Sequence, residues 1–172
     1  MEELVDANLY YLEQAESLLS RMENVDYASS DIAFFGSSIG QHLRHCFDHY
    51  LSFIWGASSG KIDYDHRQRE SEIECLTEGA LACLEAIRND LQSLKNQDLT
   101  ENQRIRVKMD CGDGENAWQE STFGRELQFL VSHTVHHFAI ISGIAGRKGL
   151  ILDESFGVAP STLRFRAKAG ID

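Results

Sequence analysis

The sequence predicts an all-α protein, a four-helix bundle with a small β-hairpin inserted between the third and fourth helices. Four long segments place apolar residues at steps of three and four, which is the period of an amphipathic helix that faces a core. The single proline, Pro160, lies near the end of the chain, so no proline interrupts the earlier segments. One short stretch alternates in the manner of strands, and it accounts for the hairpin.

The four helices are expected at about residues 2–24, 38–55, 68–96 and 122–145. Ser37 or Ser38 should cap the second helix, and Ser121 or Thr122 the fourth, because a hydroxyl there accepts a bond from an otherwise unpaired N–H group. Residues 1–172 are expected to form one domain, with the tail at 150–172 packed over the bundle and frayed at its end. The expected core residues are Leu12, Leu19, Leu43, Phe47, Leu76, Leu84, Leu91, Leu127, Leu130 and Ile141.

The hairpin is expected between the last two helices. The segment RIRVKMD at 104–110 alternates as a strand, CGDGEN supplies a turn rich in Gly and Asp, and AWQEST at 117–122 provides a second short strand. The stretch at 56–70, GASSGKIDYDHRQRE, has Gly and Ser at its start and is expected to be a connector to the third helix.

The composition is that of an acidic globular protein. Lys and Arg number 16 and Asp and Glu 27, giving a formal net charge of −11 at pH 7, while 42% of the residues are hydrophobic. Such a charge repels the phosphates of nucleic acids and the anionic surface of membranes, so neither is an expected partner. The N-terminal residues lack the pattern of a signal peptide, and no apolar run approaches the length of a membrane span. A cytoplasmic location and a small-molecule substrate are therefore expected.

Histidines are the informative residues. Six of the seven lie in two of the predicted helices. The second helix reads SIGQHLRHCFDHY, so its three histidines lie on one side of the helix, and the fourth reads LVSHTVHHFAI. These six histidines are His42, His45, His49, His133, His136 and His137.

The spacing in the fourth helix favours a metal site. His133 and His137 are one turn apart, so both imidazoles can reach one ion at about 2.0–2.1 Å, and a histidine from the facing helix would complete a three-histidine set. Any one histidine on an apolar helix face is more often a packing residue that is hydrogen-bonded to a neighbour. Two adjacent buried imidazoles are costly unless their nitrogens are satisfied, and this favours the metal. A bundle with hydrogen-bonded histidines and no metal remains the alternative.

The chain resembles the DinB/YfiT superfamily of four-helix-bundle metalloproteins, through IGQHLRH in its second helix and HTVHHF in its fourth. The resemblance covers roughly residues 4–145. It implies that His45, His133 and His137 hold the metal and that His42, His49 and His136 line the pocket or support the ligands. From the sequence itself, Asp48 is a candidate to hold a ligand imidazole by its other N–H group, although an exposed carboxylate is an equal alternative.

The resemblance also implies an activity. Similar bundles are thiol-dependent transferases and isomerases, so the expected function is transfer of a low-molecular-weight thiol to a small electrophile with a divalent ion, Zn²⁺ or Ni²⁺, as cofactor. Iron ranks lower because no carboxylate ligand can be named. A metal-dependent hydrolase is an alternative, since a bound ion also activates water. A further alternative is a non-catalytic metal-binding bundle, and a homodimer is expected.

Overall fold

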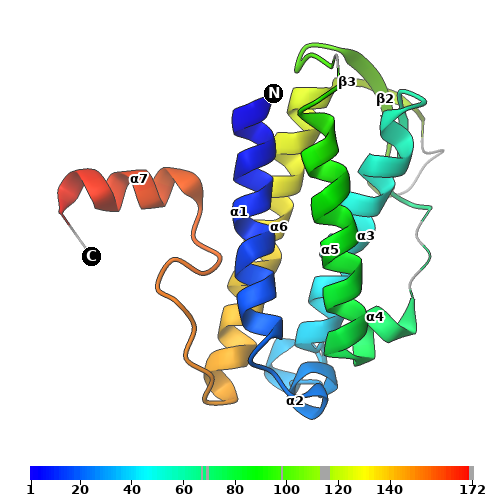
Figure 1. The fold of residues 1–172 in the computed structure, drawn as a ribbon. Coiled ribbons are helices and arrows are strands. Elements are labelled where there is room, and N and C mark those ends of the chain that lie inside the picture. Colours follow the sequence, from blue (N-terminus) through cyan, green and yellow to red (C-terminus); the bar gives the residue numbers. More distant parts are fainter. Residues whose placement is uncertain (67, 69, 98, 113–116, 171–172) are drawn as a thin grey trace.

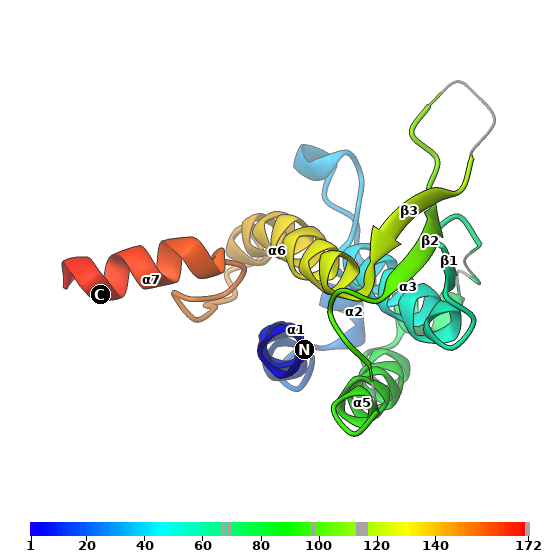
Figure 2. The same cartoon turned by 90° about the horizontal axis from the view of Figure 1, so that it is seen from above.

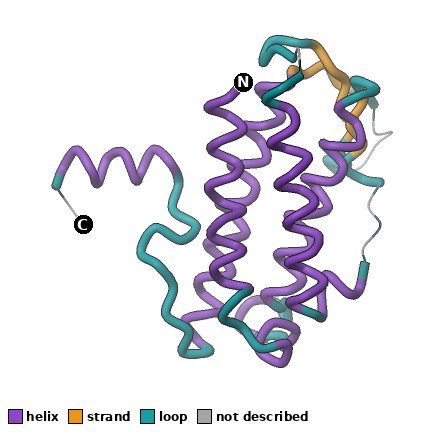
Figure 3. The backbone as a smooth tube through the Cα atoms, viewed as in Figure 1, coloured by secondary structure: helices purple, strands orange, loops and turns teal. Residues whose placement is uncertain are grey.

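The computed structural model describes every residue except 67, 69, 98, 113–116 and 171–172. Four long helices form the bundle: α1 (Glu2–Leu19), α3 (Ile39–Ala57), α5 (Thr77–Leu94) and α6 (Phe123–Arg147) (Figure 1). Viewed from above, α1 and α3 each pack between α5 and α6 (Figure 2). The two histidine-bearing helices, α3 and α6, are therefore neighbours. Figure 3 shows that helices make up most of the backbone and that the strands gather at one end.

Both long histidine helices begin at caps that the sequence suggested. Ser38 accepts a bond from the backbone N–H of Gln41, and the Gln41 side chain accepts one from the backbone N–H of Ser38, so the two form a capping box. Thr122 accepts from the backbone N–H of Arg125 at the start of α6. These caps fix where the helices begin, and thereby the face on which each histidine lies.

Two of the predicted helices have different bounds in the structure. The first ends at Leu19, not near residue 24, and a separate short helix, α2 (Asn24–Ala28), and the 3₁₀ turn η1 (Ile32–Phe34) follow it. The third does not begin at Gln68: it is divided into α4 (Ser71–Cys75) and α5, with Leu76 between them in an extended conformation and 41% exposed. The prediction that Leu76 belongs to the core was therefore wrong.

The break at Leu76 has a visible cause. The N–H and hydroxyl of Thr77 both donate to the side chain of Asn24 in α2, which supplies an N-terminal partner for α5. The Tyr27 hydroxyl donates to the carbonyl of Ile73 at 2.6 Å and holds α4 against α2 and α3. Contacts with α2 thus override a helical pattern that continues through Leu76 in the sequence.

The predicted hairpin is present, and the sheet contains one strand more than expected. β2 (Arg104–Lys108) pairs antiparallel with β3 (Gln119–Thr122), while part of the predicted turn, residues 113–116, lies outside the described residues. β1 (Lys61–Asp63), from the segment expected to be a connector, pairs parallel with β2. Ile62 and Ile105 are buried beneath this sheet, which anchors the segment that follows β1 against the bundle.

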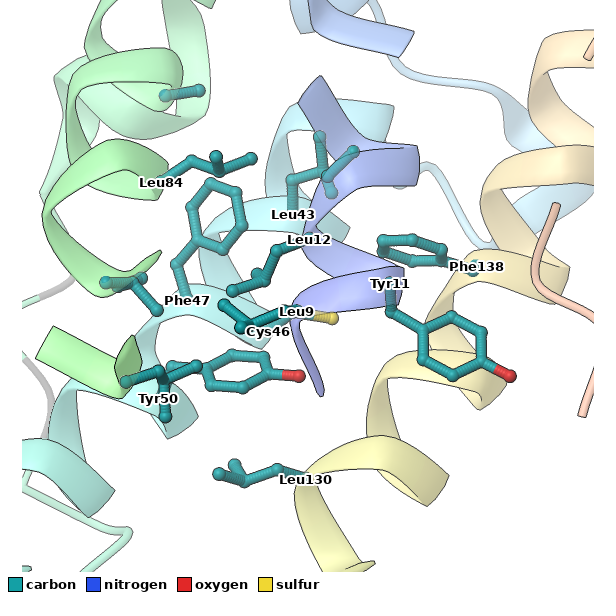
Figure 4. Packing of buried hydrophobic residues seen from close by; sticks show 14 of the residues in the cluster. Leu9, Tyr11, Leu12, Leu43, Cys46, Phe47, Tyr50, Leu84, Leu130 and Phe138 are labelled. Atoms are coloured by element: carbon teal, nitrogen blue, oxygen red, sulfur yellow. The ribbon is translucent and has the colours of Figure 1, made fainter. Parts of the chain in front are cut away.

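The core fills the space between the four long helices (Figure 4). Apart from Leu76, all the residues expected in the core are buried. A polar network also lies inside it: Tyr50 donates to the Asn8 side chain at 2.9 Å, and the Asn8 amide donates to the carbonyl of Leu127. Thr134 donates to the Tyr50 hydroxyl, so the network joins α1, α3 and α6 and leaves these buried groups satisfied.

The tail agrees with the prediction only in its first part. Phe156 stacks on Phe138 of α6 with ring centroids 4.8 Å apart, and Tyr11 of α1 donates to the carbonyl of Val158. Gly157 has a φ of +68°, and a Cβ there would lie 2.9 Å from the Phe138 backbone, so glycine permits this close approach. Beyond it, α7 (Pro160–Ala169) extends away from the bundle and does not wrap over it (Figure 1).

α6 is also long and apolar enough, by length and composition, to cross a membrane, contrary to the expectation from the sequence. It is the one helix of this kind among the residues that the structure describes. A core helix of a bundle passes the same test, and α6 packs against both α1 and α3.

Candidate metal centre

The facing sides of α3 and α6 bring the histidine rings into one cluster. His45 lies between the two helices, with its ring centroid 4.9 Å from that of His133 and 4.6 Å from that of His137. The His133 and His137 centroids are also 4.6 Å apart. The three residues expected as ligands therefore lie together, although they come from positions 45 and 133–137 of the chain.

A second set of three histidines overlaps the first. The His49 ring lies 4.6 Å from that of His45 and 4.1 Å from that of His133. One nitrogen each of His45, His49 and His133 lies within 4.8 Å of the other two, so this is the set whose donor atoms converge in the structure. His45 and His133 are common to both sets. The sequence predicts His49 only as a pocket or supporting residue, and the ligand assignment itself stays a prediction.

A directed chain of hydrogen bonds sets the tautomer of His137. The Ser37 hydroxyl donates to the Phe34 carbonyl, so its oxygen accepts from Nε2–H of His42 at 2.8 Å. The Nδ1 atom of His42 then carries a lone pair and accepts from Nδ1–H of His137 at 2.9 Å. This order of donors leaves the lone pair of His137 on Nε2, the state in which a neutral imidazole binds a metal.

His49 is oriented in a similar way. Its Nδ1 lies 2.9 Å from the carbonyl oxygen of His45, one turn earlier on α3. A carbonyl can only accept, so Nδ1 carries the proton and the lone pair lies on Nε2. A backbone carbonyl that fixes the tautomer of an imidazole is a common feature of metal-binding histidines.

The environment of the cluster favours neutral imidazoles. Burial lowers the pKa of His137 to about 3, and the neighbouring His42, His136 and His49 contribute in the same direction. Burial also lowers the pKa of His42, with His136 adding to the effect. Neutral rings are what a metal requires, since a protonated nitrogen has no lone pair to offer.

Aromatic side chains close one side of the cluster. Tyr64, just after β1, stacks on His49 with ring centroids 5.4 Å apart and an interplanar angle of 23°, and Phe129 lies 5.5 Å from His133. The Tyr64 hydroxyl donates to the carboxylate of Glu126 at 2.9 Å, and that carboxylate also accepts from Ser121. Burial raises the pKa of Tyr64, and Glu126 raises it further, so the hydroxyl keeps its proton.

The sequence analysis did not identify Tyr64, Phe129 or Glu126 as site residues. Phe129 and Glu126 lie four and seven positions before His133, which places them on the same face of α6, and this spacing could have indicated them. Glu126 is buried, which is unusual for a carboxylate on an apolar face. Tyr64 carried no such signal, because it lies in a segment without periodicity.

Two other expected site residues lie at the edge of the cluster or beside it. His136 is exposed, with its ring centroid 5.0 Å from that of His137. The buried carboxylate of Asp48 accepts a bond from Arg44 at 2.6 Å, and Arg44 also pairs with Glu74 of α4. This ion pair accounts for the burial of Asp48. Cys46, beside His45, is buried, and burial raises the pKa of its thiol, so it is a packing residue.

The donor set fits a divalent ion such as Zn²⁺ or Ni²⁺. Imidazole nitrogens bound to one tetrahedral ion at about 2.0–2.1 Å are about 3.4 Å apart, so the three nitrogens, now within 4.8 Å of one another, would need to approach by up to about 1.5 Å. Imidazole nitrogens suit zinc, nickel, copper and iron, and three of them leave coordination positions for another molecule.

Comparison with known proteins decides the family. The model of the DinB superfamily matches residues 10–141, which include part of α1, all of α3 and α5, most of α6 and both histidine segments. The chain belongs to the DinB superfamily. This membership and the histidine cluster together are compatible with a metal-binding protein.

A curated fungal protein also matches this DinB-superfamily chain. It is called FK506-binding protein 5 and comes from Rhizopus delemar; the two are 30% identical over 103 residues, which is 60% of this chain. The match spans 27% of the fungal protein, so the two share one region and differ in overall length.

Proposed function

We propose that this chain is a divalent-metal-dependent enzyme that transfers a low-molecular-weight thiol to a small electrophile. The observation that carries the proposal is the convergence of imidazole nitrogens from α3 and α6 at one point. A divalent ion bound by His45, His133 and either His49 or His137 would supply a Lewis acid that lowers the pKa of a thiol or water. In the transfer, the thiol loses its proton, its sulfur forms a bond to the electrophilic carbon, and the leaving group departs with the bonding pair.

The protein's own residues have separate roles in this proposal. The hydrogen bonds between Ser37 and His42 and between His42 and His137 hold the His137 imidazole in the metal-binding tautomer. Tyr64 and Phe129 exclude water from one side of the cluster, which strengthens electrostatic interactions within it. The acidic net charge favours a neutral or cationic electrophile and a cytoplasmic small molecule over a polyanion.

The test combines metal-loaded protein with a panel of small electrophiles and low-molecular-weight thiols, with product formation followed by mass spectrometry. The expected result is that the parent protein forms the product in which the thiol is bonded to the electrophile. The His45→Ala, His133→Ala variant should not form this product. Failure to detect an adduct with any pair, in protein shown to contain metal, would overturn the transferase proposal.

Two alternatives make different predictions for the same protein. A hydrolase would release products from ester or amide substrates without a thiol, because three histidines also suit the activation of water. A non-catalytic metal-binding bundle would show no turnover with either panel, and anions would not shift the spectrum of Co²⁺-substituted protein. The proposed enzyme should show a shift of the Co²⁺ spectrum when anions are added, because an exchangeable coordination position would bind them.

A further inference from the structure

The C-terminal helix α7 lies apart from the bundle. None of its residues, all of which are described, is buried, and Phe165 is 65% exposed (Figure 1). The helix carries Arg164, Arg166 and Lys168 and no acidic residue, in a chain whose net charge is −11. An isolated helix of ten residues is marginal in water, so an exposed one with an apolar side chain gains stability from a partner.

The direction of α7 is fixed by the residues before it. Tyr11 holds the Val158 carbonyl at 2.7 Å, and Gln14 accepts from the N–H of Gly157. Pro160 begins the helix and keeps Ala159 in an extended conformation. α7 therefore leaves the bundle at a set angle and points outward, as both views show (Figures 1 and 2).

A hollow that matches Phe165 lies between α1 and the segment at 153–156. Its volume is about 200 Å³, and a cavity of about 150 Å³ is enough to admit a benzene ring. Its walls include the rings of Tyr10 and Phe156 and the carboxylates of Glu13 and Asp153. The remaining lining residues are Gln14, Ser17, Arg21 and Ser155, and Arg21 donates to the Ser17 carbonyl.

We propose that Phe165 of one copy enters this hollow in a second copy, with Arg164 and Arg166 beside Glu13 and Asp153. The apolar ring meets aromatic walls, and the two guanidinium groups meet the two carboxylates. Exchange of α7 about a twofold axis makes this contact twice, because each copy offers both the helix and the hollow. The tail therefore contributes to both sides of the interface: α7 of one copy, and Asp153, Ser155 and Phe156 beside α1 in the other.

A second copy is a better partner for α7 than a polyanion. A phosphate-rich surface would attract three basic residues but repel the remainder of an acidic chain. Another copy offers acidic groups around a hollow of suitable size, and it does not require long-range attraction between the bundles. This inference is independent of the proposed function, since α7 carries none of the cluster histidines.

The first experiment measures self-association by sedimentation equilibrium. Phe165→Asp should raise the dimer dissociation constant at least tenfold, and the charge reversal Arg164→Glu, Arg166→Glu should do the same. Phe35→Asp is the matched control, because Phe35 is fully exposed, lies in the loop after η1, and has a left-handed backbone that Asp tolerates. A monomeric parent, or a dimer that Phe165→Asp leaves unchanged, would overturn the proposal.

The second experiment identifies the contact. In a background with Cys75, Cys83 and Cys111 changed to Ser, which leaves only the buried Cys46, the variants Ser17→Cys and Phe165→Cys each carry one accessible cysteine; the two are mixed and oxidised. A disulfide that joins one chain of each kind is the expected product. If no bond forms between the mixed chains, or if a variant that carries both substitutions forms the bond only within one chain, the hollow of a second copy is not the site. Binding of α7 to phosphatidylserine vesicles in that case would indicate an anionic surface as its partner. Circular dichroism checks that every variant keeps its helices.

Discussion

At the scale of single residues, the chain of hydrogen bonds from Phe34 to His137 has a consequence for metal affinity. Ser37 holds His42 in the tautomer that accepts a hydrogen bond from His137, so the loop before α3 fixes the tautomer of a histidine on α6. Loss of such a supporting bond typically lowers metal affinity 10–100-fold. The effect arises without removal of any ligand atom.

If His137 is one of the ligands, Ser37→Ala is expected to weaken zinc binding by about 10–100-fold while the fold stays intact. Competition with a chromophoric chelator measures the affinity. Ser132→Ala, which changes an exposed serine beside His133, is the matched control and should leave affinity unchanged. Equal affinities for Ser37→Ala and the parent would show that the bond to His42 does not orient His137.

The two overlapping sets of histidines can be separated by single substitutions. His49→Ala should lower metal affinity more than about 100-fold if the converging nitrogens of His45, His49 and His133 hold the ion. His137→Ala should do so if the ligands are those implied by the superfamily. We expect one of these two substitutions to cause a clearly larger loss of metal affinity than the other, and isothermal titration with Zn²⁺ measures both losses. His136→Ala is the control, and a loss with it as large as with either would contradict both assignments.

Sequence predicts the histidines at this scale but not their neighbours. The spacing of residues along a helix is visible in one dimension, so the sequence alone indicates that His133 and His137 share one site with a histidine of the facing helix. His45 was implied only by the resemblance to the superfamily. The contact of Tyr64 with His49 depends on how two separate segments pack. The ion pair of Asp48 with Arg44 depends on which neighbouring side chain binds the carboxylate. No local pattern encodes them.

At the scale of elements, the approach of α4 to α3 depends on one glycine. A Cβ added at Gly40 would lie 2.0 Å from the carbonyl oxygen of Glu74 and 2.9 Å from the Tyr27 ring. The backbone of α4 thus lies directly against the first turn of α3, where the cap and His42 are also found. A side chain at position 40 would displace α4, α3 or both.

Gly40→Ala is accordingly expected to lower the free energy of unfolding by about 1–3 kcal/mol, the usual cost of overpacking. Gly146→Ala on α6 is the matched control, because a Cβ there meets nothing within 4 Å and alanine favours a helix by about 0.5–1 kcal/mol. Urea denaturation gives both values. A Gly40→Ala protein as stable as the parent would contradict the close contact with Glu74.

The element scale also shows where sequence patterns end. Periodicity continues through Leu76, yet the helix breaks there because Thr77 binds Asn24. The hairpin was predictable from alternation, whereas β1 has only three residues and pairs with β2 across more than forty positions. α7 lacks a buried face and gives no amphipathic signal, which explains why a tail wrapped over the bundle was the wrong expectation.

At the scale of the whole molecule, burial of the histidines couples folding to pH. The pKa of His137 is lowered from 6.5 to about 3, so between these values the unfolded chain binds a proton that the folded chain excludes. In the metal-free protein, the contribution of the neutral His137 to the free energy of unfolding is therefore fully present above about pH 6.5. This contribution is lost as the pH decreases toward about 3. The lowered pKa of His42 acts in the same direction.

Urea denaturation of chelator-treated protein at about pH 7.5 and about pH 5 tests this coupling. The parent should be less stable at the lower pH, and His137→Ala should show a smaller decrease. His66→Ala, an exposed histidine after β1, should keep the decrease of the parent. A parent that is equally or more stable at the lower pH would show that the cluster is not held neutral by burial.

The bundle itself was predictable from sequence because its helices carry long, regular apolar patterns that only mutual packing can bury.

The central claim of this account is that the cluster on α3 and α6 binds a divalent metal. Elemental analysis of protein purified without an affinity metal column, beside the His45→Ala, His133→Ala variant, tests it most directly. We predict near one equivalent of a single divalent metal in the parent and none in the variant. No metal in either protein after incubation with Zn²⁺, Ni²⁺ and Fe²⁺ would contradict the claim and leave the histidines as packing residues.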